Sequence, residues 1–183
     1  MAGTECCNEE FIGRFKSYMK YIWATLSDWN GTAPIRSMNF KCPDQVIYAD
    51  ASGTVGFGAI ETSSKQYTHG VWTEEDIDES FRVKATSSTL LEIHAICLAI
   101  KTLARINSHI QVYSDSMTAV LVLQKRYCRS SDFIQGLIIT MDRWCYQHSI
   151  TLAFNHVYRE DSNIQIVDSL SKGMVVVLTS INV

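Results

Sequence analysis

Apolar residues in the first part of the chain recur at three- and four-residue intervals, with polar residues between them. The members of this stripe are Phe11, Phe15, Tyr18, Met19, Ile22, Leu26 and Trp29. This period is typical of an amphipathic helix. The pattern stops at Asn30-Gly31, and both prolines, Pro34 and Pro43, follow. We therefore expect an N-terminal helix and linker over residues 1–44, a main domain over 45–173, and a C-terminal tail over 174–183.

The pattern changes at Gln45 to short alternating β-rich segments separated by Ser/Gly turns. Gln45–Ala51, Val55–Glu61 and Gln66–Trp72 predict three antiparallel strands. Two further strands and four helices are expected afterwards: a helix over 88–106, a strand over 109–114, helices over 117–125 and 131–147, a strand over 150–157 and a helix over 163–172. This order predicts an α/β fold with a mixed five-stranded sheet flanked by helices.

Length and composition limit the class of protein. A chain of 183 residues with 46% hydrophobic residues suits one compact domain and is too apolar for a disordered chain. No apolar run is long enough to span a membrane. The start of the chain lacks the pattern of a signal peptide, and the six cysteines form no Cys-x-x-Cys pair. We expect a cytoplasmic or nuclear protein that is not secreted and has no membrane partner.

The net charge of −3 argues against a protein that simply coats DNA. Five of the 19 acidic residues, however, lie within Glu74–Glu79, so 14 acidic residues oppose 16 basic residues elsewhere. The remaining surface is therefore mildly positive, and net charge excludes no nucleic-acid partner.

Single carboxylates stand at apolar positions of four predicted elements. Asp50 ends the first strand, Glu92 lies on the apolar face of a helix, Asp115 follows a strand, and Asp168 lies within the last helix. Burying an unpaired carboxylate costs several kcal/mol. Each one alone is explained by a cap, a turn or a surface ion pair, but a divalent metal site explains all four together.

The segments around these carboxylates resemble a ribonuclease H domain, most closely those that accompany reverse transcriptases in retroelements and pararetroviruses. The segments are Tyr48-Ala-Asp-Ala-Ser52, Leu91-Glu-Ile-His-Ala95, Val112-Tyr-Ser-Asp-Ser116 and Val167-Asp-Ser-Leu-Ser-Lys-Gly173. The likeness covers about residues 45–173 and implies the ribonuclease H-like fold. It also implies hydrolysis of the RNA strand of an RNA–DNA hybrid with two Mg²⁺ ions, with Mn²⁺ as a substitute.

The resemblance also implies a role for each carboxylate. Asp50 would bridge both ions, Glu92 and Asp115 would hold the ion on the leaving-group side, and Asp168 would hold the ion that activates water. His156 matches a histidine that assists proton transfer or product release; a solvent-exposed histidine at a strand end is the alternative. With two Mg²⁺ ions bound, the formal charge would change from −3 to +1.

Candidate substrate contacts are polar or basic residues near these segments: Ser52, Ser116, Lys125, Arg126, Arg129 and Asn163. Lys125, Arg126 and Arg129 form the densest basic cluster, which suits phosphates but also suits a solvated helix end. Asn163 precedes Asp168 by five residues, where the family usually has four. A reverse transcriptase region, in cis or in trans, is a further expected partner.

Two other functions fit the same residues. A ribonuclease H-like domain that has lost catalysis would serve as a scaffold or nucleic-acid-binding module. A related nuclease or strand-transfer enzyme would keep the fold and change the substrate. The presence of all four carboxylates favours the hybrid-cleaving enzyme, and the Asp-Glu-Asp-Asp order argues against an integrase-type enzyme.

Overall fold

The computed structural model describes residues 42–74, 87–128 and 131–174, together with seven positions nearer the N-terminus. The chain divides into two compact units, Met1–Met38 and Asn39–Val183. In the first unit the described positions are helical: Ile12, Phe15, Lys16, Met19, Ile22, Trp23 and Leu26. Four of them, Phe15, Met19, Ile22 and Leu26, belong to the predicted apolar stripe. Of the acidic run, only Glu74 is among the described residues.

A five-stranded sheet organises the second unit. Its strands are β1 (Gln45–Ala51), β2 (Gly56–Glu61), β3 (Gln66–Val71), β4 (His109–Ser114) and β5 (Thr151–His156). The spatial order is β3-β2-β1-β4-β5. The pairs β1–β2 and β2–β3 are antiparallel, whereas β1–β4 and β4–β5 are parallel. The expected mixed sheet is confirmed.

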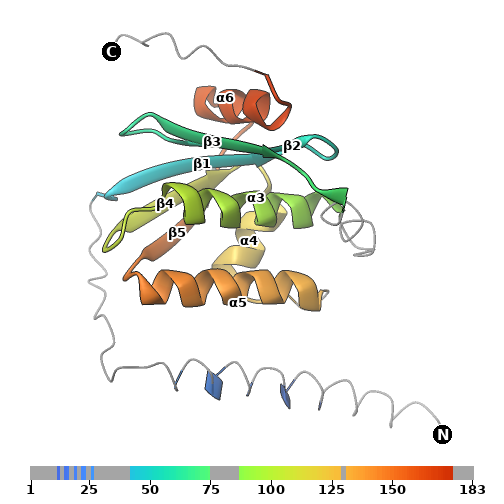
Figure 1. The fold of residues 1–183 in the computed structure, drawn as a ribbon, viewed down its shortest axis with the longest axis vertical. Coiled ribbons are helices and arrows are strands. Elements are labelled where there is room, and N and C mark those ends of the chain that lie inside the picture. Colours follow the sequence, from blue (N-terminus) through green and yellow to red (C-terminus); the bar gives the residue numbers. More distant parts are fainter. Residues whose placement is uncertain are drawn as a thin grey trace, which may run out of the picture. The chain divides into compact units, whose positions relative to one another are not determined.

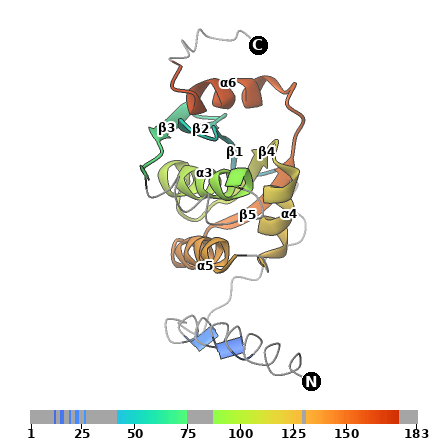
Figure 2. The ribbon, with the colours of Figure 1, turned by 90° about the vertical axis from the view of Figure 1, so that its right-hand side faces the viewer.

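Helices cover both faces of this sheet (Figures 1 and 2). They are α3 (Ser87–Leu103), α4 (Met117–Lys125), α5 (Asp132–Gln147) and α6 (Ser162–Ser171). Helix α6 lies over β1 and β2 on one face. Helices α3 and α4 lie on the other face, and α5 packs against α3. The fold is therefore a three-layer α/β arrangement with the sheet in the middle.

Strand β1 packs against helices on both faces of the sheet, because its side chains alternate between the two faces. Ile47 and Ala49 are fully buried in the main core with α3. Tyr48 faces the opposite way and packs with the smaller cluster that contains Ile164 and Val167 of α6. Because side chains alternate along a strand, Asp50 follows Tyr48 onto the α6 side.

Helix α3 ends at Leu103, three residues before the predicted end at Ile106. The side chain of Gln45 explains the early end. Its Nε2 donates to the Leu103 carbonyl at 3.1 Å, and its Oε1 accepts from the Arg105 amide at 2.7 Å. Asn107 then adopts φ 58°, a left-handed conformation that redirects the chain into β4. Hydrogen bonds from Gln45, which is distant in sequence, thus end the helix one turn earlier than the sequence pattern predicts.

Among the described residues, no helix has the length and apolarity needed to cross a membrane.

Candidate active site

The candidate site lies at the carboxyl ends of the parallel strands β1 and β4. Their pairing ends at Tyr48 and Tyr113, whose rings stack with centroids 4.9 Å apart. Beyond that pair, Asp50 continues β1 and Asp115 follows β4. From β1 the chain continues to β2 on one side of the strand, whereas β4 lies on its other side. At such a switch in strand order, α/β sheets open a crevice that binds ligands.

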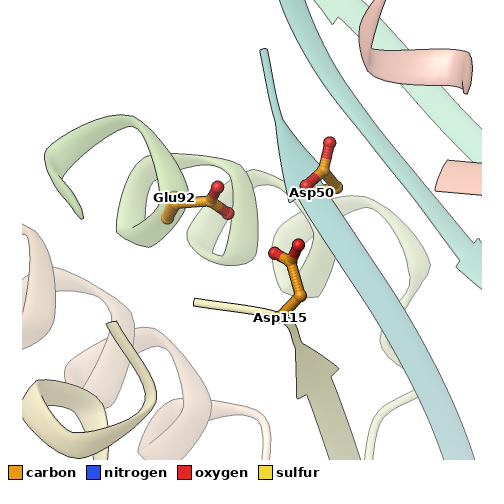
Figure 3. A group of neighbouring side chains, drawn as sticks. All are labelled: Asp50, Glu92 and Asp115. Carbon is orange, nitrogen blue, oxygen red and sulfur yellow. The ribbon is translucent and has the colours of Figure 1, made fainter. Parts of the chain in front are cut away.

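Glu92 of α3 completes a cluster with these two aspartates (Figure 3). One carboxylate oxygen from each of Asp50, Glu92 and Asp115 lies within 4.8 Å of the other two. Asp50 is 2% exposed and Glu92 is 9% exposed. Three carboxylates from a strand, a helix and a loop therefore face one small space.

Helix α6 reaches Asp50 because β2 carries a glycine beside it. Gly58 pairs with Asp50, and a Cβ at Gly58 would lie 2.5 Å from the Val167 carbonyl oxygen. This close approach brings the Ser171 hydroxyl to 2.8 Å from Asp50 Oδ2, to which it donates. Ser171 is itself buried. Its hydrogen bond restricts the rotation of the Asp50 carboxylate.

Burial and mutual repulsion disfavour the charged forms of the clustered carboxylates. Burial raises the pKa of Asp50, the Ser171 hydrogen bond opposes this rise, and the charges of Asp115 and Asp168 add to it. Burial and the charges of Asp50 and Asp115 raise the pKa of Glu92 to about 9. Glu92 Oε2 is buried and has no hydrogen-bond partner. Hard oxygen donors with excess negative charge and one unpartnered oxygen fit a divalent cation such as Mg²⁺ or Mn²⁺.

Asp168, the fourth predicted carboxylate, is not a member of this close group. It lies on α6, and its Oδ2 forms an ion pair at 2.6 Å with Nζ of Lys172, one helical turn later. Its charge nevertheless contributes to the raised pKa of Asp50. The structure thus brings three of the four carboxylates together and places the fourth beside them, with its own counter-ion.

His156 lies at the end of β5, close to the site. Its Nε2 is 3.2 Å from the main-chain oxygen of Asp115, and its ring meets Tyr158 edge-on at 5.5 Å. The imidazole is therefore next to the backbone that carries a cluster carboxylate. Its role in proton transfer or product release stays a prediction.

Asn163 is directed toward a tyrosine. Its side chain opposes the rise in pKa that burial causes at Tyr48, and its backbone amide donates to Asp161 Oδ1 at 2.8 Å. Five residues separate it from Asp168, which places the two side chains about 140° apart around the helix. The unusual spacing therefore has a structural consequence, since Asn163 and Asp168 occupy different faces of α6.

The two predicted serines act within local turns. Ser116 is the N-cap of α4, and its hydroxyl accepts from the Ala119 amide at 3.4 Å. The Ser52 hydroxyl accepts from the Val55 amide at 3.4 Å, and its carbonyl accepts from Trp72 Nε1 at 2.7 Å. These contacts shape the loops beside Asp50 and Asp115. Substrate contact by either serine stays a prediction.

The predicted basic cluster is only partly free for phosphates. Arg126 pairs with Asp142 at 2.9 Å, and its guanidinium lies 4.8 Å from the centre of the Phe154 ring. Lys125 is exposed in the last turn of α4. Arg129 lies outside the described residues. Arg126 is therefore already held by the protein.

Three residues at the site were not predicted from the sequence: Ser171, Lys172 and Arg159. Ser171 stands on the apolar stripe of α6 with Ile164 and Val167, and a polar residue on such a stripe is a usable signal. Lys172 follows Asp168 at i+4, a spacing that favours ion pairs. No sequence pattern indicates Arg159, because it reaches Asp115 only through the pairing of β4 with β5.

Comparison of the sequence with protein-family models and with curated proteins finds no match. Solved structures do match the fold. LC11-RNase H1 in complex with an RNA/DNA hybrid aligns with a TM-score of 0.55 and 19% identity, over 71% of this chain and 95% of that chain. The N-terminal RNase H domain of Rv2228c from Mycobacterium tuberculosis aligns with a TM-score of 0.50 and 16% identity, over 70% and 93%.

These similarities define the class of structure. The chain has the ribonuclease H-like fold, with the mixed five-stranded sheet that its sequence predicts. The structural neighbours are ribonuclease H domains, and one of them was solved with an RNA/DNA hybrid. Identities below 20% carry the fold and no more, so activity has to be argued from the site.

Proposed function

We propose that this protein is a metal-dependent nuclease that hydrolyses the RNA strand of RNA–DNA hybrids. The observation that carries the proposal is the cluster of Asp50, Glu92 and Asp115 at the carboxyl ends of β1 and β4. It occurs in a ribonuclease H-like fold, at the edge where such sheets open. The structural neighbour LC11-RNase H1 was solved in complex with an RNA/DNA hybrid, which is also the predicted substrate.

The chain's own residues supply ligands for divalent cations and a hydrogen bond that orients one of these ligands. Asp50, Glu92 and Asp115 would hold divalent cations, with Asp168 at the side of α6 as a further ligand. Such ions lower the pKa of a bound water and stabilise charge on the phosphate. Ser171 orients Asp50 through its 2.8 Å hydrogen bond. His156, beside the Asp115 backbone, is placed to accept or donate a proton near the site.

The resemblance of the four acidic segments extends this proposal to the origin of the protein. We infer a retroelement- or pararetrovirus-type domain that works with a reverse transcriptase region in cis or in trans. The cytoplasm or the nucleus, where such hybrids form, is the inferred location.

Cleavage of a labelled RNA–DNA hybrid tests the proposed activity. The protein should cut the RNA strand with Mg²⁺ and not with EDTA, and it should leave a DNA duplex and a double-stranded RNA intact. Asp50→Asn should lower the rate by about 10²–10⁴-fold, because it removes a ligand from the buried cluster. Asp132→Asn is the matched control, since Asp132 is exposed in the first turn of α5.

Two outcomes would contradict the proposal. Equal cleavage by Asp50→Asn would exclude the acidic cluster as the catalytic site. Binding of the hybrid without cleavage, under any divalent cation, would identify the protein as a nucleic-acid-binding module on this fold.

A further inference from the structure

Two cationic side chains at the rim of the site already pair with its carboxylates. Arg159 Nε lies 3.0 Å from Asp115 Oδ2, and Lys172 Nζ lies 2.6 Å from Asp168 Oδ2. The Arg159 and Lys172 side chains are 77% and 46% exposed, whereas those of Asp115 and Asp168 are 11% and 30% exposed. Each cation therefore extends through solvent and places its charged end on a more buried carboxylate.

The backbone around Arg159 is held in position from both sides. On the β5 side, the Val157 amide donates to the Ser114 carbonyl at 3.1 Å. On the α6 side, the Asp161 amide donates to the Tyr158 carbonyl at 3.0 Å and closes a turn that has Arg159 at its tip. Asp161 then caps α6. This turn directs Arg159 toward Asp115.

Lys172 is positioned by the end of α6. It is the C-cap residue of that helix and stands one turn after Asp168. Its neighbour Ser171 binds Asp50, so the last turn of α6 contacts two acidic residues of the site. Arg159 thus reaches the site from the turn before α6, and Lys172 reaches it from the end of α6.

The charge of Arg159 acts beyond its direct partner. It opposes the rise in pKa of both Asp50 and Glu92. In turn, the hydrogen bond to Asp115 and the charges of Asp115, Asp168 and Asp50 raise the pKa of Arg159. Arg159 therefore partly neutralises the whole acidic site.

Both pairs are weak enough to be exchanged. Ion pairs with a solvent-exposed cation are weak, because solvent screens them and long side chains lose freedom on pairing. Asp115 and Asp168 are also carboxylates that would hold divalent cations at this site, so cation and side chain would compete for the same groups. A guanidinium or an ammonium that is released from its carboxylate can bind a phosphate oxygen instead. Both groups lie next to the proposed site for a phosphodiester.

We propose that Arg159 and Lys172 compete with divalent cations for Asp115 and Asp168 and, when displaced, bind the phosphate backbone of the nucleic-acid substrate. The first half concerns the acidic site alone, and the second half rests on the proposed function. The two halves predict opposite effects of the same substitution. Loss of either cation strengthens binding of the metal and weakens binding of the hybrid.

Calorimetric titration of the EDTA-treated protein with Mg²⁺ or Mn²⁺, without nucleic acid, tests the first half. Arg159→Gln and Lys172→Gln should each tighten cation binding about two- to tenfold. Arg159→Lys, which keeps the charge, should stay close to the parent. Arg105→Gln is the matched control, because Arg105 is exposed and its guanidinium binds the Asp44 carbonyl at the opposite ends of the strands.

Hybrid binding in an Asp50→Asn background, which suppresses cleavage, tests the second half. Arg159→Gln and Lys172→Gln should weaken binding, and each should reduce the slope of log K against log salt by about one. Arg105→Gln should leave both quantities unchanged.

Unchanged or weaker cation binding in Arg159→Gln would overturn the competition. Unchanged hybrid affinity and salt slope would overturn the phosphate contact. If the Asp50→Asn protein binds no hybrid at all, the proposed function fails together with the phosphate contact, while the cation titration still decides the competition independently. Thermal unfolding of each variant excludes a folding defect, and the exposure of both side chains predicts none.

Discussion

The Ser171 hydroxyl donates a 2.8 Å hydrogen bond to Asp50 Oδ2 across 121 positions of sequence. Both residues are almost fully buried. The bond joins the last turn of α6 to the central strand, and it favours the charged form of a carboxylate whose pKa burial raises. It therefore connects the stability of the fold with the charge of the site.

Removing this hydroxyl should harm both stability and cation binding. Ser171→Ala leaves a buried carboxylate oxygen without its donor, which costs about 1–3 kcal/mol. Urea unfolding should show that loss, and cation titration should show weaker binding, because the pKa of Asp50 rises further. Ser169→Ala is the matched control, since its hydroxyl only bonds the Gln165 carbonyl of its own helix at 2.9 Å. Equal effects of the two substitutions would contradict the role of Ser171.

Gly58 controls the distance between α6 and the sheet. A Cβ there would lie 2.5 Å from the Val167 carbonyl oxygen and 2.8 Å from the Ser171 amide nitrogen, and both are backbone atoms. Gly58→Ala should therefore displace α6 and cost about 1–3 kcal/mol of unfolding free energy. Cleavage should fall as well, because Ser171 and Asp168 move with the helix. Gly53→Ala, with nothing within 4 Å of its Cβ, should leave unfolding and cleavage unchanged; a similar loss in both variants would show that helix spacing is not the cause.

Glu92 makes stability depend on pH when cations are removed. Its pKa is about 9 in the folded protein against an ordinary value of 4.5. Between these values the folded protein holds a proton that the unfolded chain releases, so the unfolding free energy falls as pH rises through this window. Glu92→Gln avoids that fall and should be more stable than the parent by about 1–3 kcal/mol at pH 7.

Urea unfolding in EDTA at pH 4, 7 and 9 checks this expectation. The difference between Glu92→Gln and the parent should be smallest at pH 4 and grow with pH. Excess Mg²⁺ should reduce or reverse this difference, because cation binding stabilises the protein that keeps the carboxylate more than the variant. A difference that does not change with pH would show that Glu92 ionises normally.

Glu61 should show the opposite pH dependence. Burial raises its pKa, but hydrogen bonds from the Ser64 hydroxyl and amide and the Ser63 amide outweigh burial and lower it below the ordinary 4.5. The Ser64 amide lies 2.7 Å from Oε2 and the Ser63 amide lies 3.0 Å from Oε1. The ionised carboxylate therefore stabilises the β2–β3 turn at pH values above 4.5, and that contribution is lost as pH falls through the folded pKa.

Glu61→Gln should lose about 1–2 kcal/mol at pH 7, because charge-assisted hydrogen bonds become neutral ones and one acceptor becomes a donor. Unfolding measured at pH 7 and pH 3 should show this loss shrinking at the lower pH. A loss that stays constant would assign the effect to packing instead.

Local patterns were sufficient to predict most of the fold. Alternation predicted β1 and β4 with the same bounds, and helical spacing predicted Met117–Lys125 as the structure has it. Such patterns work because burial on one face repeats with the period of the element itself. The early end of α3 was missed, since it depends on Gln45, which lies 60 positions from Arg105.

The sequence by itself determined the order of the elements, the mixed sheet and the four carboxylates that stand at apolar positions. Only the tertiary structure decided which of them meet: Asp50, Glu92 and Asp115 cluster, while Asp168 pairs with Lys172. It also decided that Arg159 and Ser171 reach this site. The physical reason is that periodicity reports which face of an element is buried, whereas contacts between side chains depend on strand order and on the close approach that Gly58 permits.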